Sequence, residues 1–430
     1  MARPQSGRSL ARASVVQAVF TSLPLILTVA LALRVGFAWN WQSHLPQRAL
    51  SVIPFLFESG NIAHSLATGA GFSSPFRVDT GPTAWMTPLY PLLLSAIMRI
   101  FGSYTFASWI AAVSLNITAS TAACIPIFAV GRRIGGLHLA AAATWLWAIF
   151  PNAILLSFES LWDTSLSALL GATLLWATLR VCESRGRAAW GAYGLLWGVV
   201  LMTNAALVSL LPFLVGWLIY RRGLAGPLLT AAIALVCCLP WTIRNYSMFH
   251  SFIPLRSVLG LQLWVGNNPA AKVVWLGEHH PINDTAERNR YVAMGEVAYM
   301  GEKTSQAVRY MTTHPRHEVG LIWGRFVSIW SGGTPSPISD LFSPRTAWFR
   351  YVLLFNLCTA LGTLVGIILL FRRGSPYAFP VAVYPLIYPW AFYLTLALPR
   401  YRHPIDPVLM LVTAVTLLEL TGRGTASSRL

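Results

Sequence analysis

Acidic residues are scarce in this sequence: 14 of its 430 residues are Asp or Glu, and charged residues of both signs make up only 10%. Soluble globular domains usually carry about 25% charged residues, so this scarcity excludes a soluble domain. Hydrophobic residues make up 55% of the chain, and its mean hydropathy is +0.58. The composition therefore predicts an all-α polytopic membrane protein.

Cysteine is also rare, and the common nucleotide-binding motifs are missing. The five cysteines lie in or beside apolar segments without the spacing of metal ligands; they are Cys124, Cys182, Cys237, Cys238 and Cys358. The adjacent pair Cys237 and Cys238 indicates helix packing. No P-loop or Rossmann fingerprint is present, so nothing predicts a nucleotide site.

Basic residues outnumber the acids and give a formal net charge of +17. They are dispersed along the chain, whereas nucleic-acid binding requires a basic patch, so we expect no nucleic-acid partner. Many stand at predicted cytoplasmic helix ends, such as the pairs Arg132–Arg133, Arg221–Arg222 and Arg372–Arg373. This bias follows the positive-inside rule and indicates contact with anionic membrane lipids.

About ten membrane-spanning helices can be laid out, since a span needs about 20 apolar residues. They are Val15–Val35, Phe106–Val130, Leu137–Ile154, Leu161–Leu179, Ala189–Leu201, Ala205–Tyr220, Leu224–Trp241, Phe349–Phe371, Tyr377–Leu398 and Ile405–Leu420. Counting Pro88–Phe101 as a further span is the main alternative. That choice would move Arg132 and Arg133 to the outer side, so the charge bias favours a helix at the membrane interface.

This topology predicts a cytoplasmic N-terminus at residues 1–14, a transmembrane domain at 15–421 and a cytoplasmic tail at 422–430. The first span is long for a signal peptide and has no cleavage site after it, which indicates an uncleaved anchor. Two long segments, 36–101 and 242–348, connect spans on the outer side. Loops of this length are uncommon unless they are functional, and we expect interfacial helices within them.

The acids are distributed unevenly between the two sides. Glu183 and Glu419 are the only ones at predicted cytoplasmic ends, and the other twelve lie on the outer face or just inside it. Chemistry is therefore expected at the outer face. Glu58 and Asp163 stand at the mouths of apolar segments, where an ionised side chain is costly to hold, and they are the candidate catalytic residues.

Both acids also have a structural interpretation. Glu58 begins a predicted short helix, where the macrodipole favours a carboxylate. Asp163 precedes Thr164 and Ser165, a pattern typical of a helix N-cap. The apolar neighbours of Asp163 predict partial desolvation and a raised pKa.

Arginines at the outer ends of spans run against the charge bias. Arg244 follows one span, and Arg400 and Arg402 follow another, with Tyr401 between them. Bidentate recognition of a phosphate is one explanation, and snorkelling to lipid headgroups is the alternative.

A group of metal-ligand residue types occurs in the second long segment, at Glu278, His279, His280 and Asp284. Adjacent histidines in a loop rarely both bind one ion. We therefore assign no metal ligands from the sequence.

Several motifs in chain order resemble the GT-C superfamily of membrane glycosyltransferases. An outer-loop acid stands before G-x-G-F, a second acid follows F-P, and the most specific stretches are TPLYPLLLS, LPWTIRNY and RYRHPIDP. The nearest branch is the bacterial one related to protein O-mannosyltransferases and lipid A aminoarabinose transferases. Members often have two adjacent acids in the first loop, whereas Glu58 is flanked by Phe57 and Ser59. The identity of the base and the need for a divalent metal ion therefore stay open.

The resemblance implies transfer of a sugar from a polyprenyl-phosphate donor to an acceptor at the outer, periplasmic face of the bacterial inner membrane, with inversion. Glu58 and Asp163 match the family's two loop acids. The donor phosphate would be bound by Arg244, Arg400, Tyr401 and Arg402. A flippase of lipid-linked sugars and an inactive scaffold of the same fold are the alternatives, and the sugar and the acceptor are not specified.

Overall fold

The computed structural model describes residues 18–44, 55–184, 186–274 and 277–422. The predicted N-terminal segment 1–14 and the tail beyond residue 422 lie outside these ranges. Within them the fold is helical without any strand, and the one β-type contact is a bridge between Ser73 and Pro82. The prediction of an all-α polytopic fold is confirmed.

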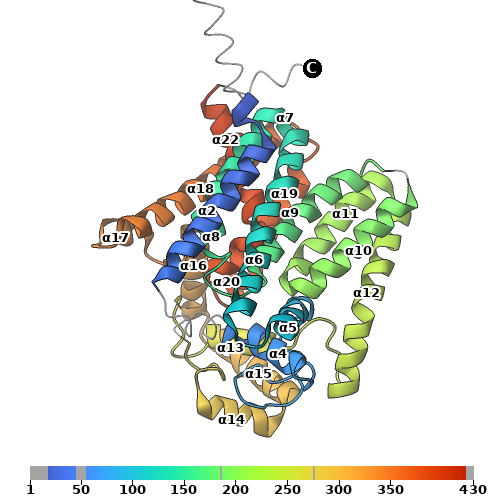
Figure 1. Ribbon diagram of the computed structural model, residues 1–430, viewed down its shortest axis with the longest axis vertical. Helices are drawn as coiled ribbons and strands as arrows, with labels where there is room; N and C mark the ends of the chain where they lie inside the picture. Colours follow the sequence, from blue (N-terminus) through green and yellow to red (C-terminus); the bar gives the residue numbers. More distant parts are fainter. Residues whose placement is uncertain (1–17, 45–54, 185, 275–276, 423–430) are drawn as a thin grey trace, which may run out of the picture.

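The long helices form the body of the molecule (Figure 1). They are α2 (Leu23–Ser43), α6 (Phe106–Ala122), α7 (Cys124–Ile149), α9 (Thr164–Val181), α10 (Arg187–Thr203), α11 (Leu211–Arg222), α12 (Ala225–Phe249), α18 (Ala347–Arg372) and α22 (Asp406–Leu420). The remaining elements are α4 (Glu58–Ala67), α5 (Leu89–Phe101), α8 (Pro151–Leu155), η2 (Ala205–Leu210), α13 (Leu259–Gly266), α14 (Thr285–Met294), α15 (Glu296–Thr313), α16 (Pro315–Ser331), α17 (Pro337–Phe342), α19 (Ala378–Ile387), α20 (Trp390–Leu394), α21 (Pro399–Arg402) and η3 (His403–Ile405).

Seven helical stretches of the described chain are long and apolar enough to cross a membrane. The ten predicted spans all correspond to helices, because one of the seven, Phe106–Ile149, contains two of them. The other two predicted spans are α10, with 17 residues, and the pair α19 and α20. Boundaries differ most at α2, which ends at Ser43, and at α12, which continues to Phe249.

The chain reverses within α7 at Gly135 and Gly136. Gly136 has a φ of +77°, in the left-handed region that favours glycine. The two arms then pack so closely that a Cβ on Gly131 would lie 2.7 Å from Cα of Ala140. The turn of this helical hairpin directly follows Arg132 and Arg133, the pair that the charge bias predicts at a helix end.

Small residues also set the packing of α10 on α12, which stand with α11 to one side of the body (Figure 1). A Cβ on Gly198 would lie 2.4 Å from Cβ of Cys237, and one on Gly194 would lie 2.8 Å from the carbonyl oxygen of Thr230. Close approach at small residues is the usual way in which membrane helices associate. The predicted packing role of Cys237 is confirmed.

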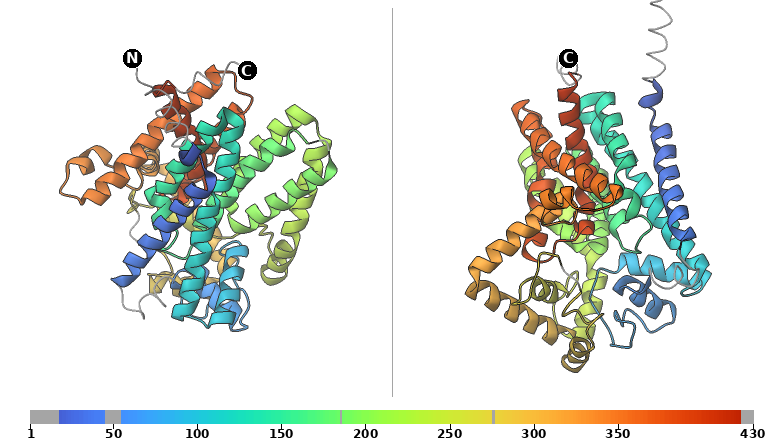
Figure 2. Two further views of the ribbon diagram at one scale, coloured as in Figure 1. Left: turned by 45° about the horizontal axis from the view of Figure 1, so that its top comes forward. Right: turned by 90° about the vertical axis from the view of Figure 1, so that its left-hand side faces the viewer.

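The two long segments predicted on the outer side gather at one end of the molecule. Figures 1 and 2 show α4, α13, α14 and α15 at the end opposite to that where α2 begins and α22 ends. Helix α5 has 13 residues, too few for a span, and lies crosswise to the long helices (Figure 2). The segment Pro88–Phe101 thus has the length and the orientation expected of an interfacial helix.

The two acids predicted at cytoplasmic ends are paired with arginines. Glu183 forms an ion pair with Arg133, and Glu419 forms one with Arg373. All four side chains are partly or fully solvent-accessible, so these pairs contribute little to stability. Neither acid lies near a candidate site at the other end.

Candidate functional site

The start of α4 and the loop before α9 are tied together by backbone and side-chain contacts. The Ser59 hydroxyl donates a hydrogen bond of 2.9 Å to the carbonyl oxygen of Leu161. Next to it, a Cβ on Gly60 would lie 2.1 Å from the carbonyl oxygen of Phe55, so only glycine allows this close approach. The rings of Phe57 and Trp162 are 5.0 Å apart. Residues about 100 positions apart in the sequence are thus brought side by side.

Both candidate acids line one cavity of about 230 Å³. Its wall comes from α4, the loop before α9, the break between α10 and η2, the chain around α13, and α21. Four of the six predicted site residues line it: Glu58, Asp163, Arg400 and Tyr401. Arg244 and Arg402 do not.

Glu58 is the first residue of α4, as predicted, and is buried, with 8% of its surface exposed. Its Oε1 lies 3.4 Å from Nε2 of His280. Its Oε2 has no hydrogen-bond partner in the part of the chain that the structure describes. A buried carboxylate oxygen without a donor is unusual, because desolvation without compensation is unfavourable. This oxygen is free to accept a hydrogen bond from a molecule in the cavity.

Asp163 directly precedes α9 but does not cap it through its side chain. Its Oδ2 accepts hydrogen bonds from the Ser167 hydroxyl at 2.8 Å and from the Asn204 amide at 3.2 Å. Asp163 lies outside the membrane-spanning segment Thr164–Val181, and burial raises its pKa, as predicted, against the opposing effects of Ser167, Arg256 and Arg400. One oxygen of this carboxylate is therefore fixed in place.

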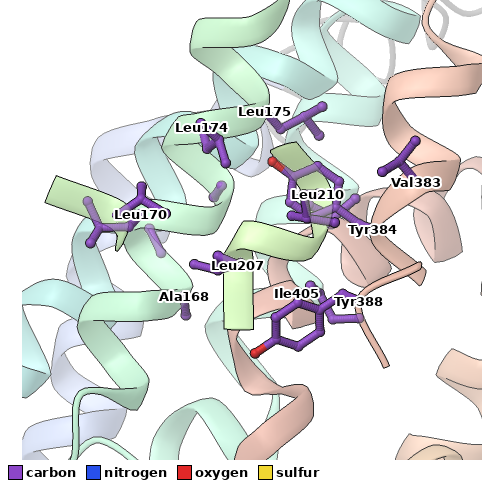
Figure 3. Packing of buried hydrophobic residues seen from close by; sticks show 14 of the residues in the cluster. Ala168, Leu170, Leu174, Leu175, Leu207, Leu210, Val383, Tyr384, Tyr388 and Ile405 are labelled. Carbon is purple, nitrogen blue, oxygen red and sulfur yellow. The ribbon is translucent and has the colours of Figure 1, made fainter. Parts of the chain in front are cut away.

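The break between α10 and η2 supplies the Asn204 amide. The Asn204 Oδ1 caps η2 by accepting a hydrogen bond from the backbone N–H of Ala206. Leu207 and Leu210 of η2 pack against α9 and against Tyr384 and Tyr388 (Figure 3). This packing fixes the break, so the amide points back to Asp163.

Two arginines approach the acids. The guanidinium of Arg400 lies 4.0 Å from the ring centre of Trp162, a cation–π contact, and Arg400 affects the pKa values of both Asp163 and His280. Arg256 lines the same cavity. Its guanidinium donates a long hydrogen bond of 3.5 Å to the Gln262 side chain. These two cations are available to an anion in the cavity.

The guanidinium of Arg244 is directed elsewhere. It donates hydrogen bonds of 2.6 Å and 2.7 Å to the carbonyl oxygens of Thr83 and Phe72, and one of 3.0 Å to the Asn245 side chain. Because this group is occupied by the outer loop, the predicted phosphate contact at Arg244 is not retained. Sequence position alone could not show that α12 continues past Trp241 and carries Arg244 to that loop.

Arg402 is buried, with 2% of its surface exposed. It forms an ion pair of 2.6 Å with Asp406 and donates to the carbonyl oxygen of Ile329 at 2.9 Å and to the Asn356 side chain. These partners saturate the guanidinium and join α21 to α16 and α18. The predicted contact between Arg402 and a phosphate is therefore also not retained.

Several lining residues escaped the sequence reasoning. Arg256, Asn204 and Tyr388 carry no motif, and His280 stood out only as one of several metal-ligand residue types. The Tyr388 hydroxyl and the Trp162 indole N–H are both buried without a hydrogen-bond partner among the described residues. Arg256, like Arg244, is an arginine on the predicted outer side, and this property could have marked it as a candidate.

A metal site does not form from these side chains. Among the described residues, no group of three or more His, Cys, Asp or Glu side chains is arranged to hold an ion. Asp284 instead caps α14 by accepting from the backbone N–H groups of Ala286 and Glu287.

No protein-family model matches the chain, and no curated protein sequence matches it. Solved structures are similar in fold. The Archaeoglobus fulgidus oligosaccharyltransferase in complex with an inhibitory peptide and a dolichol-phosphate has a TM-score of 0.54 at 14% identity, over 93% of this chain and 50% of that one. The same enzyme with Zn and sulfate has a TM-score of 0.55 at 13% identity, over 94% and 50%.

ArnT from Cupriavidus metallidurans, bound to undecaprenyl phosphate, has a TM-score of only 0.38 at 14% identity, over 97% of this chain and 78% of that one. The chain spans about half the length of the archaeal oligosaccharyltransferase. The fold of this chain is therefore similar to that of the half of the archaeal oligosaccharyltransferase that it covers.

Proposed function

We propose that the chain is a membrane glycosyltransferase that moves a sugar from a polyprenyl-phosphate donor to an outer-face acceptor, with inversion. The observation that carries the proposal is the cavity in which the free Oε2 of Glu58 and the cations of Arg256 and Arg400 face the same space. The archaeal enzyme of similar fold, crystallised with a dolichol-phosphate, supports the donor class. The cavity's position among the long outer segments supports a periplasmic site in a bacterial inner membrane.

The reaction needs a base and a counter-charge. In this proposal Glu58 takes the proton of the acceptor hydroxyl as the new bond to the anomeric carbon forms. The bond from that carbon to the phosphate oxygen breaks, and its electron pair stays on the lipid phosphate. Arg256 and Arg400 stabilise the charge that develops there, and the free hydroxyl of Tyr388 is a further donor.

Asp163 has a different role in the proposal. Its Oδ2 is already bound by Ser167 and Asn204, so it is less suited than Glu58 to accept a proton from the acceptor. Its charge holds Arg256 and Arg400 at the cavity. Trp162 offers an indole N–H without a partner among the described residues, a donor suited to a sugar hydroxyl.

The alternative of a flippase has less support. Transporters tend to bind their substrate near the midplane and to open toward both faces. Here the cavity shares no lining residue with the pocket at the other end of the molecule, around Cys182 and Tyr377. The assay for sugar transfer also tests the second alternative, an inactive scaffold, because a scaffold would show no transfer.

The test is transfer by the purified protein in lipid nanodiscs, with a panel of polyprenyl-phosphate-linked hexoses and pentoses and lipid, glycan and peptide acceptors. Loss of a general base lowers the rate by about 10²–10⁴-fold, which is the result expected for Glu58→Gln. Glu159→Gln is the matched control, because Glu159 is exposed and lies outside the cavity. Full activity of both Glu58→Gln and Asp163→Asn would refute the proposed site, and an inactive wild type with every donor would favour the scaffold.

A further inference from the structure

We propose that His280 is a positioning residue for Glu58: its imidazole holds Oε1 of the carboxylate and leaves Oε2 directed at the acceptor hydroxyl. This inference rests on the proposed function, because it assigns the partner of the proposed base. The two residues come from the two long outer segments, 222 positions apart in the sequence. Their ring nitrogen and carboxylate oxygen, Nε2 and Oε1, are 3.4 Å apart.

The backbone selects the tautomer of His280. The N–H of Ile282 donates a hydrogen bond of 3.2 Å to Nδ1. A ring nitrogen that accepts a hydrogen bond carries no proton, so in the neutral imidazole the proton is on Nε2. That nitrogen faces Glu58. The neutral ring is thus a donor to Oε1 of the carboxylate.

The environment keeps the ring neutral and fixed. The rings of Trp85 and Phe76 contact the imidazole edge-on, with their centres 5.5 Å and 6.2 Å from its own. His280 is buried, with 9% of its surface exposed. The charged groups that face it are Glu58 from α4 and Arg400 from α21. Burial lowers the pKa of His280, Arg400 lowers it as well, and Glu58 opposes them. Near neutral pH the ring is therefore uncharged.

The surrounding loop is shaped to hold this orientation. The carbonyl oxygen of His280 accepts hydrogen bonds of 2.9 Å from the N–H groups of both Asn283 and Asp284. Asp284 in turn caps α14. The histidine is thus fixed at both its backbone and its ring, which a loop residue without a function in the cavity would not require.

The experiment compares three substitutions that differ in what they keep. His280→Gln retains an N–H donor at the position of Nε2, His280→Asn retains only an acceptor for the Ile282 N–H, and His280→Ala retains neither. We expect kcat to fall about 10-fold in His280→Ala and His280→Asn, the loss expected for one hydrogen bond to a charged group. We expect His280→Gln to recover most of it, with little change in KM for the donor.

Two further measurements separate positioning from folding. In the Glu58→Gln background, His280→Ala should cause less than about a twofold additional loss, because coupled residues are not additive. The acid limb of the pH–rate profile should move to higher pH in His280→Ala, since the carboxylate loses a hydrogen bond that favours its charged form. Binding of undecaprenyl phosphate should stay within about twofold of the wild type.

The outcomes are distinguishable. If Glu58→Gln is strongly impaired but His280→Ala lowers the remaining kcat by the same factor as in the wild-type background, or if His280→Gln is as impaired as His280→Ala, the positioning role is wrong and the proposed function stands. If Glu58→Gln itself is fully active, the base assigned in the proposed function is wrong, and the positioning role fails with it.

Discussion

The proposed phosphate contacts lead to a test that separates three arginines by their surroundings. Arg256→Gln and Arg400→Gln each replace a cation that faces the cavity with a shorter, neutral polar side chain. A hydrogen bond to a charged group contributes about 1.5–3 kcal/mol, which corresponds to about a 10- to 150-fold change in Kd. Arg400 lies on the Trp162 ring and is only partly exposed, so solvent screens its charge less than that of a surface residue.

The assay is binding of undecaprenyl phosphate or dolichol phosphate to the protein in nanodiscs, followed by intrinsic tryptophan fluorescence. Trp85 and Trp162, two of the 18 tryptophans, line the cavity, so lipid binding there is expected to change part of the signal. We expect Kd to rise about 10- to 150-fold for Arg256→Gln and for Arg400→Gln. We expect the melting temperature of both variants to stay near that of the wild type.

Arg244→Gln is the matched control. This change removes donors from the carbonyl oxygens of Thr83 and Phe72, and each unsatisfied buried group is unfavourable by about 1–3 kcal/mol. The expected result is a lower melting temperature with little change in Kd for the lipid phosphate. A variant Arg244→Gln that is stable but no longer binds the lipid, together with unaltered binding in Arg256→Gln and Arg400→Gln, would refute the assignment and restore Arg244 as the phosphate contact.

Three further predictions follow from individual contacts. Gly60→Ala should lower the free energy of unfolding by about 1–3 kcal/mol and reduce the rate of transfer, because the Cβ of the alanine would lie 2.1 Å from the carbonyl oxygen of Phe55. Thermal unfolding and transfer rates of the purified variant test this prediction. A fully stable, fully active variant would contradict it. Asn204→Ala removes a donor to the charged form of Asp163, so the pKa of Asp163 should rise further. Undecaprenyl phosphate should then bind more weakly as the pH is lowered, because in the proposed function the charge of Asp163 holds Arg256 and Arg400; a pH dependence of Kd equal to that of the wild type would contradict this role. Gly198→Leu should disrupt the packing of α10 on α12, because even a Cβ at this position would lie 2.4 Å from the Cβ of Cys237. Fluorescence-detected size-exclusion chromatography should show aggregation of this variant. The control Gly216→Ala should not aggregate, because Gly216 has open space around it.

Much of the fold could be predicted from the sequence because lipid imposes simple rules. Apolar runs of sufficient length become helices, and the arginine pairs mark their inner ends. These rules predict the ten spans, a chain reversal beside Arg132–Arg133 and a separate short helix at Pro88–Phe101. They do not determine where a helix stops in the outer segments, where water can satisfy the backbone, and α12 therefore extends past the predicted end at Trp241.

The candidate site could be predicted only in part. Glu58 and Asp163 stood out because an acid beside apolar residues is unusual, and the cavity contains both. Arg256 and Arg244 could not be ranked from the sequence, because both are outer-face arginines near the end of α12. What separates them is tertiary: backbone carbonyls occupy Arg244, whereas Arg256 lines the cavity. The pairing of His280 with Glu58 depends on two loops that only the fold brings together.

The buried acids of the outer segments show which structural property singles out a candidate base. Glu296 is buried but receives hydrogen bonds from Thr83, Ala84, Ser257 and Tyr291, so its charge is fully compensated and it holds the outer loop together.

Glu318 is buried with both oxygens unpaired, yet burial raises its pKa, and it lies outside the cavity lining. Among the described residues, Glu58 alone combines a buried carboxylate oxygen without a hydrogen-bond partner with a place in the cavity lining. A proposed base has to satisfy both conditions, because an unpaired oxygen outside the cavity, as in Glu318, cannot reach the acceptor.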